Sequence, residues 1–260
     1  MAGELSITTW NVNSIRARLD HASEWLAEHE PDIVCLQETK VEDALFPKVP
    51  FLELGYKVTI HGGRALCGVA TLTKVEPDEV TCGFKEGPAD KHPRILNVLV
   101  DGVRVYNLYT PNGTSLGSEA FAYKLAWLER LREEIVANYS PDENIVVTGD
   151  FNIALEDRDV WDAAYFAGKM LFTDEEKSRL QALLDFGFTD CFRKHESGGE
   201  HYTWFDYRTG GFERNKGLRI DHVYATAPMA ERCTSVVHDA TPRGWDTPSD
   251  HLPVTARFSR

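Results

Sequence analysis

The chain has 260 residues, of which 42% are hydrophobic and 27% are charged, and its net charge is −13; this composition is typical of a globular protein with a large core. No apolar run approaches the roughly 18–20 residues that a membrane helix needs, and the opening residues MAGELSITTWNV lack the basic and apolar regions of a signal peptide. The five cysteines form no C-x-x-C pair, so we expect a reduced, cytoplasmic protein without disulfides or membrane contact.

Apolar residues at helical spacing predict three amphipathic helices. They are expected over residues 14–29, over residues 118–139 after a Ser118 cap, and over residues 174–186 between Thr173 and Gly187. Short β-type runs are expected at residues 56–60, 69–72, 79–84, 95–100 and 103–109.

The strand pattern favours a mixed α/β fold. Asp101 and Gly102 separate the last two runs and suit a type I′ turn, which predicts a hairpin. Consecutive strands without helices argue against a purely parallel sheet, and the helices argue against an all-β protein. We therefore expect two mostly β layers packed face to face with helices outside. Because no linker or repeat divides the sequence, one domain is expected over residues 1–260.

Polar side chains follow the ends of the buried-looking strands. Four apolar runs end at Asn11, at Glu38, at Asp150 with Asn152, and at Asp221 with His222, and Asp250 with His251 precedes the last apolar run. Asp and Asn often punctuate strands without any function. Burying several carboxylates together is costly, however, unless a cation with hard oxygen ligands relieves their repulsion. Five such segments therefore predict a shared metal-dependent site.

A series of motifs resembles exonuclease III and the related apurinic/apyrimidinic (AP) endonucleases. They are TTWNVNSIRAR, LQETK, GVATL, YTPNG, GDFNIA, YTWFDYR, GLRIDH and PSDHLPV, in the order of that family, from residue 8 to residue 254. The later motifs look most like the bacterial exonuclease III branch. The resemblance implies an α/β fold that is a four-layer α/β/β/α sandwich, DNase I-like.

The resemblance also implies a DNA repair nuclease that depends on Mg²⁺, with Mn²⁺ as an alternative. Its expected activities are phosphodiester hydrolysis 5′ to abasic sites, 3′→5′ exonuclease action and removal of 3′-blocking groups. Its expected substrate is double-stranded DNA with abasic sites or blocked 3′ ends, and it is expected to act as a monomer. The acidic net charge opposes DNA binding at long range, but basic residues such as Arg16, Arg18 and Lys40 recur beside the polar segments.

Metal and catalytic roles follow from the motifs. Glu38 is the expected metal ligand, Asp250 a second one, and Asn11 a group that positions the metal or the phosphate. Asp150 and Asn152 are two residues apart, so an extended chain points both to one side, and the resemblance assigns nucleophile activation to Asp150.

A second pair is His251 with Asp221, since a carboxylate fixes the tautomer of an imidazole and stabilises its cation. The sequence leaves open whether Asp150 or His251 is the general base. Alternation along the strand sends His222 to the opposite face from Asp221, so a structural role is expected for His222.

The resemblance also implies substrate contacts from two further groups of residues. Tyr109, Asn112 and Arg94 are expected to contact the phosphate, and Trp204, Leu218 and Ile220 to form an apolar pocket. A deoxyribose without its base enters such a pocket at little stacking cost. Residues 153–172 match the family least and are expected to border this pocket.

Three other functions are compatible with parts of this pattern. The same fold hosts phosphatases that act on lipids or inositol phosphates. A binding protein without catalysis, or a purely structural protein, would not need every one of these polar residues.

Overall fold

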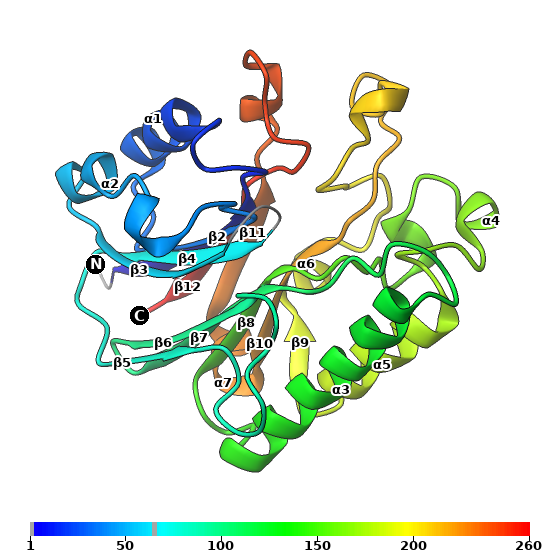
Figure 1. The fold of residues 1–260 in the computed structure, drawn as a ribbon, viewed down its shortest axis with the longest axis horizontal. Helices are drawn as coiled ribbons and strands as arrows, with labels where there is room; N and C mark the ends of the chain where they lie inside the picture. The colour runs from blue at the N-terminus through cyan, green and yellow to red at the C-terminus, as the bar shows by residue number, and fades with distance from the viewer. Residues whose placement is uncertain (1–2, 64–66) are drawn as a thin grey trace.

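The computed structural model describes residues 3–63 and 67–260, which form two six-stranded sheets packed face to face (Figure 1). The strands of the first sheet are β1 (Glu4–Asn11), β2 (Ile33–Gln37), β3 (Lys57–Gly62), β4 (Gly68–Thr73), β11 (Cys233–His238) and β12 (Val254–Ser259). Those of the second are β5 (Glu79–Cys82), β6 (Ile95–Val100), β7 (Val103–Tyr109), β8 (Ile145–Asp150), β9 (Phe188–Asp190) and β10 (Asp221–Thr226). Their orders are β11-β12-β1-β2-β4-β3 and β5-β6-β7-β8-β10-β9.

Each sheet contains one parallel strand pair. Helix α1 (Leu19–His29) connects β1 to the parallel β2, and α3 (Glu119–Asn138) connects β7 to the parallel β8. Every other pair of neighbouring strands in the described residues is antiparallel. The carboxyl ends of β1 and β2, and those of β7 and β8, therefore each meet at one edge of their sheet.

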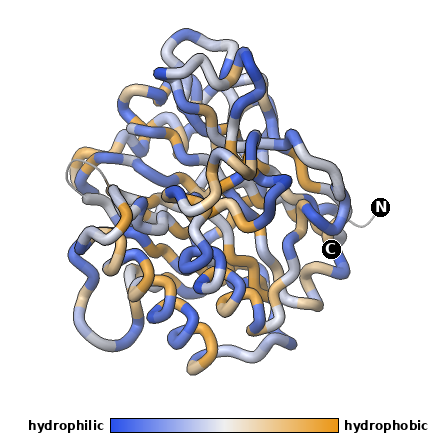
Figure 2. The backbone as a smooth tube through the Cα atoms, turned by 90° about the vertical axis from the view of Figure 1, so that its right-hand side faces the viewer, coloured by the Kyte–Doolittle hydropathy of each residue, from blue (hydrophilic) through white to orange (hydrophobic). Residues whose placement is uncertain are grey.

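Amphipathic helices cover the outer faces of both sheets, so the expected α/β four-layer arrangement is confirmed. Trp25 and Leu26 of α1 pack against the first sheet together with α2 (Val49–Glu53). On the second sheet, Leu128 and Leu131 of α3 pack beside α5 (Asp174–Leu184). In Figure 2 the helical coils alternate between hydrophobic and hydrophilic residues, as expected for covering helices. No helix among the described residues is long and apolar enough to cross a membrane.

The remaining helices are short. They are α4 (Ala163–Phe166), α6 (Cys191–His195) and α7 (Ala227–Arg232), with 3₁₀ turns at η1 (Asp43–Leu45), η2 (Asp157–Asp159), η3 (Tyr207–Thr209) and η4 (Thr241–Gly244). The segments that carry η3 and η4 project beyond the sheets as two separate loops (Figure 1).

The predicted elements agree with the structure except at some ends. The Ser118 side chain caps α3 by accepting from the Phe121 N–H, and Thr173 forms a capping box at α5, as expected. The predicted hairpin is also confirmed. The first helix, however, begins at Leu19 and not at residue 14, because Asn13 and Ser14 have left-handed φ angles of 45° and 89°.

The core between the sheets changes from apolar to polar along the strands. At one end, Ile7, Cys35, Val105 and Val146 belong to a single apolar cluster. The same face of these strands carries polar residues two positions further along. They are Thr9, Gln37, Asn107 and Thr148, and all four are fully buried. One step further come the polar strand ends, where the predicted site lies.

Asn107 joins the two sheets within this polar layer. Its Nδ2 donates to the Ala70 carbonyl oxygen at 2.9 Å, and its Oδ1 accepts from Gln37 Nε2 at 2.8 Å. Gln37 Nε2 also donates to Thr9 Oγ1 at 2.9 Å. Because buried polar groups are costly when unpaired, this layer fixes how the two sheets align.

Replacing Asn107 by leucine is expected to lower the free energy of unfolding by about 1–3 kcal/mol, because Gln37 then loses a buried acceptor. Urea denaturation of the two proteins measures this difference. A matched Val105→Leu variant, on the same strand face, tests whether added volume alone accounts for the loss. Equal or higher stability of Asn107→Leu would contradict the role of the polar layer.

Candidate active site

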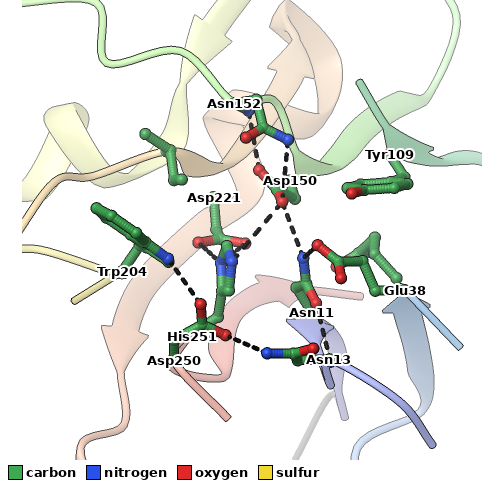
Figure 3. A network of polar contacts seen from close by, with 12 residues as sticks. Asn11, Asn13, Glu38, Tyr109, Asp150, Asn152, Trp204, Asp221, Asp250 and His251 are labelled. Atoms are coloured by element: carbon green, nitrogen blue, oxygen red, sulfur yellow. Dashed lines mark hydrogen bonds and ion pairs between the residues drawn. The ribbon is translucent and has the colours of Figure 1, made fainter. Parts of the chain in front are cut away.

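The predicted polar residues converge where the ends of the central strands of both sheets meet (Figure 3). Asn11 ends β1, Asp150 ends β8, and Asp221, which begins β10, pairs directly with Asp150. Gly149 allows β8 to approach β7 closely, since a Cβ there would lie 1.9 Å from the Leu108 carbonyl oxygen. The fold therefore brings together groups that lie far apart in the sequence.

Asp150 is the centre of this site. It is 1% exposed, and its Oδ2 accepts from Asn11 Nδ2 at 2.9 Å while its Oδ1 accepts from the Asn152 N–H at 2.8 Å. Burial, together with repulsion from Asp221 and Glu38, outweighs the attraction of His251 and raises the pKa of Asp150 to about 7. Without a bound metal ion, this environment therefore favours the protonated form of Asp150.

His251 and Asp221 form the expected pair. His251 Nδ1 lies 2.9 Å from Asp221 Oδ2, and Nε2 lies 3.8 Å from Asp150 Oδ2. Burial alone would lower the pKa of His251, but the charges of Asp221 and Asp150 outweigh it and raise that pKa to about 10. His251 is therefore an imidazolium at neutral pH, with Nδ1 donating to Asp221.

A candidate cation site lies beside Asp150. Asn11 Nδ2 also donates to Glu38 Oε1 at 2.9 Å, and one ligand atom each of Glu38, Asp150 and His251 lie within 4.8 Å of one another. The Glu38 and Asp150 carboxylates are the hard oxygen donors that a divalent cation prefers. His251 fits less well because its protonated ring has no free lone pair for a metal. Residues that can bind a divalent metal are thus present.

Asp250 lies apart from that three-residue cluster. Its Oδ2 accepts from Trp204 Nε1 at 2.9 Å and its Oδ1 accepts from Asn13 Nδ2 at 2.9 Å. The same Asn13 accepts from Lys40 Nζ at 2.5 Å, and Lys40 also pairs with Glu38 at 2.8 Å. Metal binding by Asp250 stays a prediction, and the structure shows it anchoring Trp204.

The three residues expected at the phosphate lie around the same carboxylates. Arg94 donates to the Tyr109 carbonyl oxygen at 3.1 Å, and its guanidinium lies 4.7 Å from the centre of the Tyr109 ring. Burial, with the charges of Glu38 and Asp150, raises the pKa of Tyr109, so its hydroxyl stays protonated as a donor. Asn112 Nδ2 donates to Asn152 Oδ1 at 2.9 Å.

A cavity of about 490 Å³ opens beside Trp204 and Leu218. Isolated β-bridges join Trp204 to both Leu218 and His251, which places the cavity next to the catalytic candidates. The predicted pocket residue Ile220 is 1% exposed and packs behind the wall without lining the cavity. Residues 153–172 border the cavity as expected, through Trp161, Tyr165, Phe166, Lys169, Met170 and Leu171.

His222 points away from the site. Its Nε2 lies 2.8 Å from the Ile153 carbonyl oxygen, and its ring stacks on Tyr224. Burial, assisted by Arg219, lowers the pKa of His222 to about 4, so it is neutral. This geometry agrees with the structural role expected from strand alternation.

Sequence reasoning missed three parts of the site. Asn13 orients Asp250, Trp161 forms a wall of the cavity, and Lys124 donates to the backbone of Asn152 from α3. A signal existed for Lys124, because a charged residue three positions after Phe121 falls on the apolar stripe of a predicted helix.

Comparisons with known proteins agree with this geometry. The model of the Endonuclease/Exonuclease/phosphatase family matches residues 8–251. Exodeoxyribonuclease III of Haemophilus influenzae is 34% identical, over 98% of this chain and 100% of its own length. An AP endonuclease structure from Archaeoglobus fulgidus has a TM-score of 0.94 and 39% identity, covering 98% of this chain and 99% of that one. The 3′-5′ exonuclease NExo of Neisseria meningitidis also has a TM-score of 0.94, with 38% identity over 98% of this chain and 100% of its own. The chain therefore belongs to the Endonuclease/Exonuclease/phosphatase family.

Proposed function

We propose that the protein is a Mg²⁺-dependent DNA repair nuclease that hydrolyses phosphodiesters 5′ to abasic sites and processes 3′ ends of duplex DNA. The similarity to exodeoxyribonuclease III and AP endonucleases supports this assignment. The protein is proposed to act as a monomer. The five free cysteines favour a reducing compartment, the cytoplasm.

One observation carries the proposed chemistry, namely that the buried Asp150 carboxylate lies 3.8 Å from Nε2 of the Asp221-paired His251 and beside the Glu38 carboxylate. Ionised Asp150 accepts a proton from the attacking water, while Asn152 holds the carboxylate in position. His251 and the Tyr109 hydroxyl stabilise the negative charge that develops on the phosphate. A divalent cation bound by Glu38 and Asp150 would offset charge on the phosphate and on the leaving oxygen. The raised pKa of His251 favours Asp150, and not His251, as the general base.

The pocket favours an unstacked sugar as the group that enters beside the scissile bond. Its walls are mostly apolar and aromatic, and Lys216 lies over the Trp161 ring at 4.1 Å. A second function, limited to 3′-end processing, is supported by NExo, which is also described as a 3′ phosphatase in a complex with product DNA hairpin. Both functions use the same hydrolytic residues, and they differ in what the pocket admits.

A duplex labelled at one 5′ end and carrying a single tetrahydrofuran abasic mimic tests the proposal. With Mg²⁺, we expect one cut 5′ to the mimic and no cut with EDTA. A ladder of products from the 3′ end without that cut would favour the 3′-end-processing function. No cleavage with either Mg²⁺ or Mn²⁺ would reject the nuclease assignment.

Removal of the Asp150 carboxylate is expected to abolish most of the activity. Asp150→Ala should lower kcat on the abasic duplex by about 10²–10⁴-fold while the DNA is still bound, because the general base is lost. Single-turnover cleavage and a gel-shift assay measure the two quantities. Asp142→Ala, which removes an exposed carboxylate, serves as the control. Full turnover by Asp150→Ala would exclude its role.

Trp161→Ala is expected to slow cleavage at the abasic mimic more than it slows the release of a 3′-phosphate from DNA. A terminal phosphate need not fill the pocket. The ratio of kcat/KM on the two substrates measures the effect, and we expect a change of about tenfold. Leu116→Ala, at an exposed apolar residue outside the pocket lining, is the control. An unchanged ratio would mean that the cavity does not select the substrate.

Metal binding should depend on pH through Asp150. Below pH 7 the folded, metal-free protein keeps this carboxyl protonated, because its pKa is raised from 3.8 to about 7. The stabilisation of the folded state by the bound proton is therefore lost as the pH rises toward 7. At lower pH, a cation must displace this proton in order to bind. We expect Mg²⁺ to raise the melting temperature more at pH 8 than at pH 6. An equal rise at both values, or the same rise in Glu38→Gln, would contradict this cation site.

A further inference from the structure

A buried ion pair lies behind the candidate active site. Lys124 of α3 and Glu176 of α5 are both fully inaccessible to solvent, and Lys124 Nζ donates to Glu176 Oε1. The same ammonium donates to the carbonyl oxygens of Asn152 at 2.7 Å and of Asn112 at 3.3 Å. Its three N–H donors therefore have three acceptors, two of which are the backbones of residues in the YTPNG and GDFN motifs.

Glu176 has matching contacts on the other side. Its Oε1 accepts from the Leu171 N–H at 3.2 Å, and its Oε2 accepts from the N–H and the hydroxyl of Thr173 at 3.0 and 2.9 Å. Leu171 lines the 490 Å³ cavity. The ion pair thus contacts the hydrolytic centre through Lys124 and the pocket wall through Glu176.

Two of the contacted residues have left-handed backbone conformations. Asn152 has a φ of 51° and Leu171 a φ of 71°. Asparagine adopts this region readily, but leucine rarely does. For a leucine such a conformation costs roughly 1–3 kcal/mol and persists only where the surroundings hold it. Lys124 binds the carbonyl of Asn152, and Glu176 binds the N–H of the strained Leu171.

We propose that Lys124 and Glu176 are positioning residues that hold the Asn152 amide against Asp150 and the Leu171 wall against the substrate pocket. This inference rests on the proposed nuclease function. Asn152 donates from its N–H to Asp150 Oδ1 and accepts from Asn112, so displacement of its backbone moves the carboxylate that activates water. Burial of an ion pair seldom stabilises a fold more than apolar residues of the same volume, which favours a reason other than stability for its presence.

The test compares kcat and KM on the abasic duplex for wild type, Glu176→Gln and the double variant Lys124→Met/Glu176→Gln. The double variant removes both charges and keeps the volume of the side chains, so no unpaired charge is buried. We expect its kcat to fall about 10–100-fold, because a shift of about 1 Å in a reacting group costs that much. Leu128→Ala, which opens the core one turn further along α3, controls for lost stability and should keep wild-type kcat.

Glu176→Gln separates the two halves of the proposal. It keeps Lys124 on the carbonyls of Asn112 and Asn152 but weakens the hold on Leu171, so we expect a raised KM with kcat within about threefold of wild type. Glu176→Gln leaves the buried Lys124 charge without a charged partner, so the double variant decides the question if Glu176→Gln does not fold. A fall in kcat with unchanged KM for Glu176→Gln would overturn the proposal.

Two further outcomes would also overturn the proposal. One is wild-type kcat in the double variant, and the other is an equal loss in Leu128→Ala at matched stability. An inactive wild type, by contrast, would reject the nuclease function itself, so the two failures are distinguishable.

Discussion

The constraint on which this structure depends is the burial of several carboxylates at one end of a β-sandwich. Asp150 and Asp221 are each 1% exposed and directly paired across β8 and β10, an arrangement that would repel without compensation. This compensation comes from the imidazolium of His251 and from the amides of Asn11 and Asn152. Because this compensation is incomplete, Asp150 keeps a raised pKa, and the reactive property of the site is a direct result of its burial.

Both sheets contribute to this balance, so the geometry of the site depends on their alignment. Asn11 comes from the first sheet and Asp150 from the second, and one hydrogen bond of 2.9 Å joins them. Directly below, the polar layer around Asn107 and Gln37 fixes the relative position of the same strands. The inner faces therefore serve two purposes: apolar residues hold the sheets together, and polar residues set their register.

Much of the fold, and the residues that converge in the candidate site, were predictable because the signals are local. Strand ends followed by carboxylates, the Ser118 cap and the Asp101-Gly102 turn are all written in a few adjacent residues. The start of α1 was predicted wrongly, because Asn13 turns the chain in order to reach Asp250, which is 237 residues away in the sequence. Local spacing carries no information about such a distant partner.

The pocket and the supporting ion pair were less predictable for the same reason. Residues 153–172 have no regular periodicity, and their shape depends on contacts such as the Ala154 N–H to the Leu171 carbonyl oxygen at 2.8 Å. Lys124 is recognisable in the sequence because it is a charged residue on an apolar stripe. Its partner Glu176 is not, because it follows two other acidic residues, Asp174 and Glu175, in the first turn of α5. Recognising that pair from sequence requires knowing that α3 and α5 pack together.

The change from apolar to polar along the inter-sheet core also makes the sandwich mechanically asymmetric. Water gains nothing by entering the cluster around Ile7 and Val105, whereas the opposite end offers it amides and carboxylates to solvate. We therefore expect the least costly separation of the two sheets to begin at the end that carries the candidate site. Amide hydrogens near Asn11 and Asp150 are then expected to exchange faster than those beside Ile7.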